Sequence, residues 1–75
     1  MDRNEFLANF AEQFEDTDPN DIQFGTKFHE LEEWSSLIGM MLIAMAKVSY
    51  GKVISGEELK KCVTVEDVYN LINSK

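Results

Sequence analysis

The chain opens with a helical pattern between Asn4 and Glu15, where apolar side chains recur every three or four positions. The apolar positions are Phe6, Leu7, Phe10, Ala11 and Phe14. Asp2 or Asn4 is suited to cap the start of this helix. The acidic turn from Asp16 to Asp21 ends it, because Pro19 cannot continue a helix and Asp and Asn side chains favour turns.

The next segment, from Ile22 to Trp34, has no sustained period and contains Gly25, which predicts a long ordered loop. Its apolar residues are too many to remain in solvent, so most of them should pack on the domain; they are Ile22, Phe24, Phe28, Leu31 and Trp34. Loops of this length are uncommon in small domains and are often functional.

Three further helices follow. The second begins at Ser35 or Ser36 and runs to about Tyr50, where Gly51 is placed to stop it. A short third helix is indicated by a capping box from Ser55 to Glu58. The fourth begins at Thr64, with Asp67 three positions on and apolar residues at helical spacing, namely Val65, Val68, Leu71 and Ile72. The pattern predicts an all-α fold: one domain over residues 1–75, forming a small four-helix bundle with a long loop between its first two helices.

Composition limits what such a domain can be. In 75 residues there is one cysteine, Cys62, so no disulfide forms within the chain, and Cys62 with the single histidine, His29, is too few ligands for a structural zinc site. The longest apolar run, Leu37 to Ala46, is about half of the roughly 20 residues that span a bilayer. No secretion signal is recognisable. We therefore expect a cytoplasmic domain without a membrane span.

The net charge of −7 is unevenly distributed. Ten of the 14 acidic residues precede position 37, where the only cations are Arg3 and Lys27, whereas the second half is nearly neutral. This balance argues against nucleic acid, whose phosphates need a basic face. Two interpretations are open: the acidic surface attracts basic protein partners, or it is a solvated surface that keeps the domain soluble.

Several residues invite a chemical role and do not support one. Asp16, Asp18 and Asn20 resemble the start of a calcium loop, but Lys27 stands where a bidentate Glu should close the site. His29 has no nucleophile or positioned partner for acid–base chemistry. Cys62 is expected to be a half-buried structural residue and Trp34 a loop anchor on the core. We therefore expect neither an enzyme nor a metal site.

The pair Ser35-Ser36 is more informative. One serine serves as the N-cap of the second helix. The other is then left with its hydroxyl at the positive end of that helix, which is a favourable place for a phosphate group.

Three motifs together resemble the acyl carrier protein family. They are Phe28-x-x-Leu31-x-x-Trp34-Ser35-Ser36-Leu37, Tyr50-Gly51-Lys52-Val53-Ile54, and Thr64-Val65-Glu66-Asp67-Val68-x-x-Leu71-Ile72. In that family an Asp-Ser-Leu motif opens the second helix, an aromatic-Gly pair ends it, and a Thr-Val-x-Asp segment opens the last one. The similarity covers the chain from Asn4 to Ile72. The chain departs from the family at Ser35, where the family usually has Asp.

The resemblance implies a carrier rather than an enzyme. A phosphopantetheinyl transferase would attach 4′-phosphopantetheine from coenzyme A to Ser36, with Ser35 as the helix cap beside it and Leu37 completing the motif. The arm would carry acyl groups as thioesters between synthase enzymes of fatty acid or related lipid or polyketide biosynthesis. Such a carrier is expected to act as a monomer. Residues expected to shelter an acyl chain are Met40, Leu42, Leu59 and Val63.

The second helix departs from the family because it contains no acidic residue. We expect its core face to consist of Gly39, Leu42, Ile43, Ala46 and Tyr50. The opposite stripe would dock partner proteins; it consists of Ile38, Met41, Met45 and Val48. Glu32 and Glu33, just before Ser36, would meet basic partners. Two alternatives remain open: a specialised carrier of aminoacyl or unusual acyl groups, and an unmodified helical adaptor that binds a partner through the apolar second helix.

Overall fold

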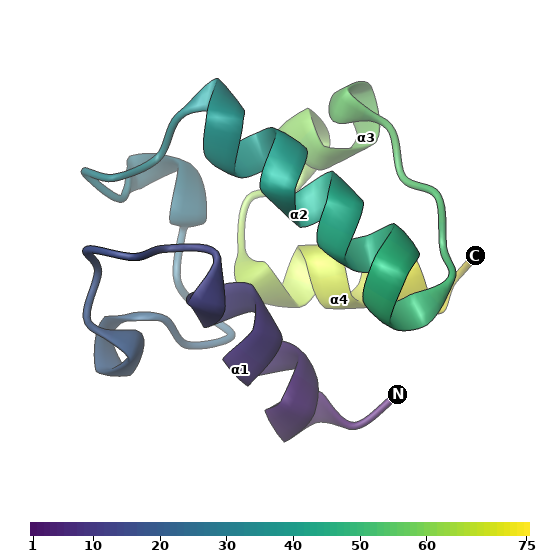
Figure 1. Cartoon of the computed structure of the whole chain (residues 1–75), viewed down its shortest axis with the longest axis horizontal. Helices are drawn as coiled ribbons and strands as arrows, with labels where there is room; N and C mark the ends of the chain where they lie inside the picture. The colour runs from purple at the N-terminus through teal and green to yellow at the C-terminus, as the bar shows by residue number, and fades with distance from the viewer.

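The computed structural model describes residues 1–75 and is all-helical, with no strand. Its four α-helices are α1 (Arg3–Glu12), α2 (Ser36–Tyr50), α3 (Gly56–Lys61) and α4 (Val65–Asn73), and two short 3₁₀ helices, η1 (Pro19–Asp21) and η2 (Phe28–Glu30), lie between α1 and α2 (Figure 1). The molecule measures 28 × 24 × 19 Å along its principal axes. The predicted all-α class, with four helices, is confirmed.

Side-chain caps explain where the helices begin. Asp2 accepts a hydrogen bond from the Glu5 N–H at 3.0 Å at the start of α1. Reciprocal capping boxes open α3 and α4: Ser55 pairs with Glu58, and Thr64 pairs with Asp67. Each cap satisfies backbone N–H groups that have no partner within the first turn of a helix. The predicted starts of these helices are confirmed.

The end of α1 differs from the prediction, which placed it at Glu15. The regular helix ends at Glu12, and the N–H groups of Gln13 and Phe14 bond to carbonyls three residues back, at 3.2 and 3.0 Å. Such tight hydrogen bonds often close the last turn of a helix. Phe14 still reaches the core, where only 3 % of it is exposed.

The longest helix, α2, ends as the sequence predicts. Gly51 has a φ of +66°, in the left-handed region that favours glycine. Its N–H bonds to the Lys47 carbonyl at 3.0 Å, and the next N–H, of Lys52, bonds to the Ala46 carbonyl at 3.2 Å. The bond from Gly51 is the 5→1 bond of an αL helix cap, in which a left-handed residue satisfies a carbonyl of the last turn. None of the helices, including α2 with its 15 residues, has the length and apolar character needed to cross a membrane.

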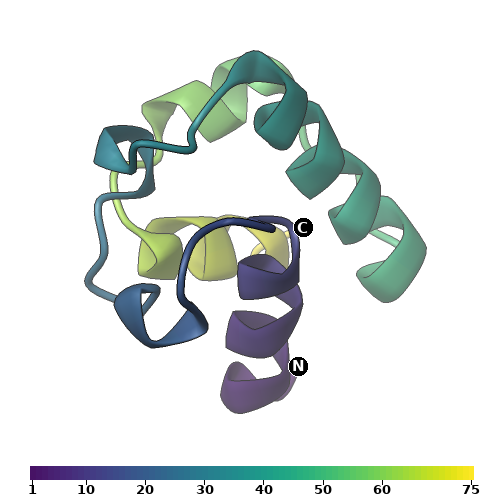
Figure 2. The same ribbon diagram turned by 60° about the vertical axis from the view of Figure 1, so that its left-hand side comes forward.

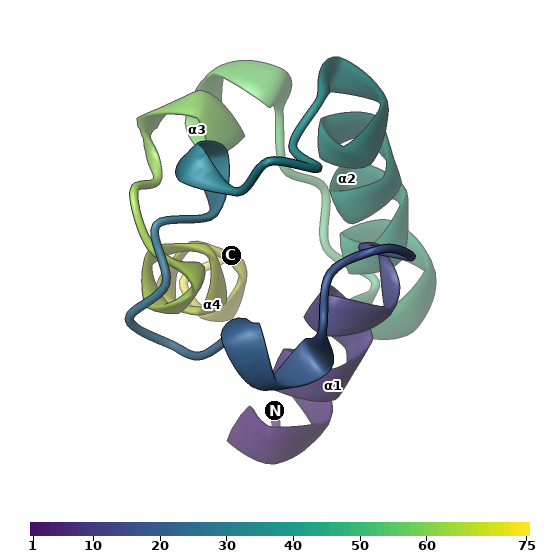
Figure 3. The ribbon, with the colours of Figure 1, turned by 90° about the vertical axis from the view of Figure 1, so that its left-hand side faces the viewer.

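The segment before α2 is attached to the start of α4. The N–H groups of Val65 and Glu66 donate to the carbonyls of Thr26 and Phe24, at 3.1 and 3.0 Å. Figure 3 looks along α4 and shows this segment passing its end and continuing toward α3. The two short 3₁₀ helices were not predicted; η1 begins at Pro19, whose missing N–H and fixed φ suit a first helical position.

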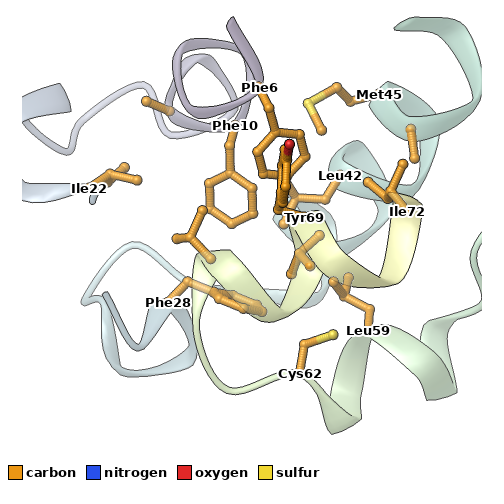
Figure 4. Packing of buried hydrophobic residues seen from close by; sticks show 14 of the residues in the cluster. Phe6, Phe10, Ile22, Phe28, Leu42, Met45, Leu59, Cys62, Tyr69 and Ile72 are labelled. Atoms are coloured by element: carbon orange, nitrogen blue, oxygen red, sulfur yellow. The ribbon is translucent and has the colours of Figure 1, made fainter. Parts of the chain in front are cut away.

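One hydrophobic core lies between all four helices and this segment, and it contains 17 buried residues. Aromatic rings form its centre (Figure 4): Phe10 meets Phe28 edge-on with ring centroids 5.5 Å apart, and Phe6 meets Tyr69 at 5.4 Å. Ile22 and Phe28 are fully buried. Phe24, Leu31 and Trp34 pack partly buried against the core, so the expectation that this apolar segment packs on the domain is confirmed.

Candidate functional site

The two serines at the start of α2 have different environments. Ser35 is the N-cap residue, and its Oγ accepts a hydrogen bond from the Ile38 N–H at 3.3 Å. Ser36 is the first residue of the helix and is exposed to solvent. Its hydroxyl takes no part in the side-chain hydrogen bonds that hold the caps and loops, so it is accessible and uncommitted.

A groove with a volume of about 360 Å³ lies beside Ser36. From α2, Ser36, Gly39, Met40 and Ile43 line it; Leu59 and Lys60 of α3 line the facing side. His29 and Trp34, from the segment before α2, also line the groove. Figure 2 shows that α3 lies near the start of α2 and the segment before it, although the rest of α2 and a loop separate α3 from them in sequence. Of the residues expected to shelter a chain, Met40 and Leu59 line the groove, whereas Leu42 is buried in the core and Val63 is 52 % exposed.

Gly39 allows one wall of the groove to lie against the helix. A Cβ atom at this position would be 3.3 Å from Cη2 of Trp34 and 3.7 Å from Cδ2 of Leu59. The first distance is tighter than ordinary van der Waals contact, so the indole could not lie so close to α2 if this residue had a side chain. Glycine inside a helix costs about 1 kcal/mol relative to alanine, and the contact with Trp34 gives a reason for it here.

His29 also lines the groove, a position near Ser36 that the sequence did not indicate. Its ring lies edge-on to Trp34, with centroids 4.5 Å apart, and 4.3 Å from the ring of Phe28. The Nε2 atom is buried and has no hydrogen-bond partner. Buried polar atoms are nearly always paired, so an exception requires an explanation. The spacing of His29 from the serine pair gives no periodic signal, because η2 and the following turn bring the two together.

The predicted docking stripe on α2 is wrong at two of its four positions. Ile38 and Met45 are buried, with 5 % and 6 % exposed, and Met41 is half-buried. Val48 is 85 % exposed, as a docking residue would be. On the expected core face, Gly39, Leu42 and Ala46 are buried, whereas Ile43 and Tyr50 are only half-buried.

The buried face of α2 is wider than predicted, because α1 and α3 both contact the helix. Contacts from two sides bury a wide arc, which includes Ile38 and Met45. The exposed apolar residues are instead Leu37, Met40 and Val48. Ser36 and Lys47 lie on this exposed face, since eleven positions correspond to three helical turns. These two polar residues could have indicated from the sequence which face of α2 is exposed. Leu37, part of the predicted attachment motif, points to solvent outside the groove lining.

The acidic approach to Ser36 forms a separate open hollow of about 660 Å³, which Glu32 and Glu33 line together with Asp16, Asp18 and Asp21. Glu33 Oε1 accepts hydrogen bonds from Thr17 Oγ1 at 2.6 Å and from the Asp16 N–H at 3.1 Å. The Thr17 hydroxyl is the main cause that lowers the pKa of Glu33.

One acid of this turn has a structural role. Asp18 caps η1 by accepting from the Asn20 N–H at 2.9 Å. No three His, Cys, Asp or Glu side chains are grouped so that they could hold a metal ion.

Cys62 is a buried free thiol, 8 % exposed, at the end of α3. Burial raises its pKa, and the charges of Asp67 and Glu58 raise it further. Its Sγ lies 3.5 Å from the Glu58 carbonyl oxygen, to which it donates. The neighbouring lysines therefore do not activate it, which agrees with the structural role that the sequence predicted.

Comparison of the chain with protein-family models, with curated proteins and with solved structures returns no match. The function therefore has to be inferred from the residues and geometry of this chain.

Proposed function

We propose that the chain is an acyl carrier protein, in which Ser36 Oγ carries 4′-phosphopantetheine. The observation that supports this most directly is that the two serines differ in their structural roles. Ser35 already caps α2, so the exposed hydroxyl of Ser36 is free for modification. The order of the motifs along the chain, which resembles the carrier family over most of its length, supports the same proposal. The finer description of the fold as a carrier-type four-helix bundle with a long loop before α2 belongs to this proposal.

The residues around Ser36 fit the prosthetic group. A phosphodiester on Ser36 would lie at the positive end of α2, whose first turn contains no acidic residue. The groove that Ser36 lines would hold part of the arm against Trp34 and Met40. Lys60, exposed on the facing side of the groove, adds a positive charge. His29 lines the same groove.

Attachment requires little chemistry from the carrier itself. The bond between Ser36 Oγ and phosphorus forms, and the pyrophosphate P–O bond of coenzyme A breaks. The adenosine bisphosphate leaves, and the proton of the hydroxyl passes to a base of the phosphopantetheinyl transferase. The carrier supplies an exposed nucleophile on a fixed helix end, and no basic side chain of its own is required. When bound, the arm supplies a thiol that holds an acyl group as a thioester between synthase enzymes of fatty acid or related lipid or polyketide biosynthesis.

Two surfaces near Ser36 are available to partner enzymes. The acidic hollow with Glu32 and Glu33 precedes Ser36 and suits basic partner surfaces. The exposed apolar residues Leu37, Met40 and Val48 of α2 suit partners with an apolar patch. We propose a monomeric cytoplasmic carrier that presents both surfaces around its attachment site.

The mass of the intact protein tests the proposal. Incubation with coenzyme A and a broad-specificity phosphopantetheinyl transferase should add one phosphopantetheine to the wild-type chain. The Ser36→Ala variant should gain nothing, and Ser35→Ala should still be modified. No mass gain in the wild type, or an equal gain in Ser36→Ala, would contradict the proposal.

A specialised carrier of aminoacyl or unusual acyl groups is the nearer alternative. It is favoured by the lack of acidic residues on α2, because enzymes built for an acidic helix should dock poorly on an apolar one. Loading by an adenylating enzyme, compared with loading by a malonyl transferase of fatty acid synthesis, separates the two. Efficient malonyl transfer would exclude the specialised carrier.

An unmodified helical adaptor is the more distant alternative, favoured by the exposed apolar residues of α2. It predicts that Ser36→Ala keeps function while Leu37→Asp and Val48→Asp lose it. Ile38 cannot serve in this test, because a charge at that buried position would unfold the protein.

A further inference from the structure

The groove beside Ser36 is closed toward the core by Trp34. The indole lines the groove and meets Phe28 edge-on, with ring centroids 5.3 Å apart. Phe28 is fully buried and does not line the groove, and it meets Phe10 at 5.5 Å in the centre of the core (Figure 4). Trp34 is therefore the side chain that separates the groove from the aromatic centre of the core at this point.

Gly39 allows the indole to close the groove against α2. Cη2 and Cζ2 of Trp34 lie 3.3 and 3.5 Å from the position that a Cβ atom of residue 39 would take, and Cδ2 of Leu59 lies 3.7 Å from it. Trp34, from the segment before α2, and Leu59, from α3, thus approach the same turn of α2. We call these two side chains, together with Gly39, the floor of the groove.

We propose that Trp34 determines the length of the acyl group that this groove shelters, and that the cargo of the carrier is therefore a short acyl group. This inference rests on the proposed function, because Ser36, the attachment residue, lines the same groove. The flexible arm folds back, the acyl group enters beside α2 and stops at the indole, and a longer chain leaves its remaining carbons in water. Trp34 is a specificity-determining residue and takes no part in the chemistry.

The lining of the groove suits a hydrocarbon chain. Ile43 and Leu59 provide apolar surface beside the indole, and Met40, 68 % exposed, borders the solvent. Lys60 also lines the groove and is exposed, so its ammonium group remains in water while its methylene groups extend the apolar wall. Transfer of the acyl carbons from water to this apolar surface drives the binding.

The volume of the groove limits the length of the chain. At about 30 Å³ for a group the size of a water molecule or a methylene, a volume of about 360 Å³ holds roughly a dozen such groups. The thioester and the end of the arm fill about a third of this space, which leaves room for about eight acyl carbons. The lining residues of α2 run from Ser36 to Ile43, about 10 Å along the helix axis, which suits a chain of this length.

A role as a loop anchor alone accounts for less of this arrangement. A smaller ring at position 34 with an ordinary residue at position 39 would anchor the loop on Phe28 equally well. This chain instead combines its only tryptophan with Gly39, although glycine weakens a helix relative to alanine. An anchor alone also predicts no dependence on acyl length, so an experiment can separate the two roles.

Stability measured as a function of acyl length tests the inference. The transferase loads the wild-type chain from coenzyme A and from a straight-chain series of acyl coenzyme A, acetyl to dodecanoyl, and the added mass verifies each product. The urea midpoint of unfolding is then measured for each form. Each methylene that enters the groove should raise the ratio of folded to unfolded protein about twofold, up to about eight carbons, and further methylenes should add nothing.

Trp34→Leu is the decisive variant, because it shortens the side chain and keeps the floor apolar. The space that it opens should move the limit to chains about two to four carbons longer. Leu31→Ala is the matched control. Leu31 comes from the same segment and packs half-buried against the core but does not line the groove, so this variant should be less stable and keep the wild-type limit.

The wild type provides a second readout that needs no variant, because the fluorescence of Trp34, the only tryptophan, reports on the floor directly. Its emission should change with each added carbon up to the limit and stay constant beyond it. An emission or a urea midpoint that is independent of acyl length, a midpoint that rises throughout the series, or the same limit in Trp34→Leu as in the wild type would overturn the inference and leave the proposed function standing. Absence of the added mass in every form would overturn both.

Discussion

Substitution of the two serines one at a time separates helix capping from modification. In Ser35→Ala the Ile38 N–H loses its acceptor, whereas Ser36→Ala removes a hydroxyl that caps nothing. We therefore expect Ser35→Ala to lower stability and to keep the modification. Ser36→Ala should leave stability nearly unchanged and should abolish the modification.

The geometry of the cap sets the magnitude. Loss of an N-cap serine costs about 0.5–2 kcal/mol. The bond from the Ile38 N–H to Ser35 Oγ is 3.3 Å, longer than the usual 2.9–3.0 Å, so we expect the lower half of that range, about 0.5–1 kcal/mol. In a domain of this size, that lowers the Tm by about 2–8 °C. Ser36→Ala should stay within about 0.5 kcal/mol of the wild type, as exposed substitutions usually do.

Urea unfolding followed by circular dichroism measures both effects, and Ser35→Asp is the control. Asp caps as well as Ser and adds a negative charge at the helix start, worth about 0.3–1 kcal/mol, so this variant should be at least as stable as the wild type. A larger loss of stability in Ser36→Ala than in Ser35→Ala would refute the assignment of the cap, and with it the reason for regarding Ser36 as free.

Three further predictions follow from burial and charge. Met45→Glu should cost at least about 2 kcal/mol in urea unfolding, because it buries a charge, whereas Val48→Glu should change stability by less than about 0.5 kcal/mol; equal effects would show that α2 is turned differently. Hydrogen bonds from backbone N–H groups, chiefly that of Thr64, lower the pKa of Asp67. The stability that Asp67 gives the folded protein is therefore present above the ordinary carboxyl pKa, and it is lost as the pH falls through the lowered folded-state pKa. Asp67→Asn should flatten that acid limb in unfolding free energies measured against pH, and an unchanged limb would contradict this reading. Cys62 should react with a thiol reagent slowly in the native protein and rapidly in urea, because burial raises its pKa and shields it; equal rates would contradict its burial.

Features encoded locally could be predicted from the sequence. The capping boxes of Ser55 and Thr64 and the glycine stop at Gly51 each depend on residues within a few positions, and the structure places the helix boundaries there. The end of α1 was placed too late because Phe14 continues the apolar period. Periodicity records which side chains are buried, and a residue beyond the helix end can be buried too.

Features that depend on tertiary contacts could not be predicted in the same way. An apolar helix such as α2 has little polar contrast to fix its rotation, so the buried positions of Ile38 and Met45 were assigned to the wrong face. His29 and Ser36 share a groove because the chain turns between them. Nothing in the spacing of these two residues indicates that turn.

The hydrogen bonds between the segment before α2 and the start of α4 have a consequence for motion. The N–H groups of Val65 and Glu66 are held by carbonyls about forty positions earlier in the chain. The same segment continues to His29 and Trp34, which form one wall of the groove. We therefore expect displacement of that wall to be coupled to the first turn of α4 through these two hydrogen bonds. Amide hydrogen exchange at Val65 and Glu66 should therefore report on movement of a groove that neither residue lines.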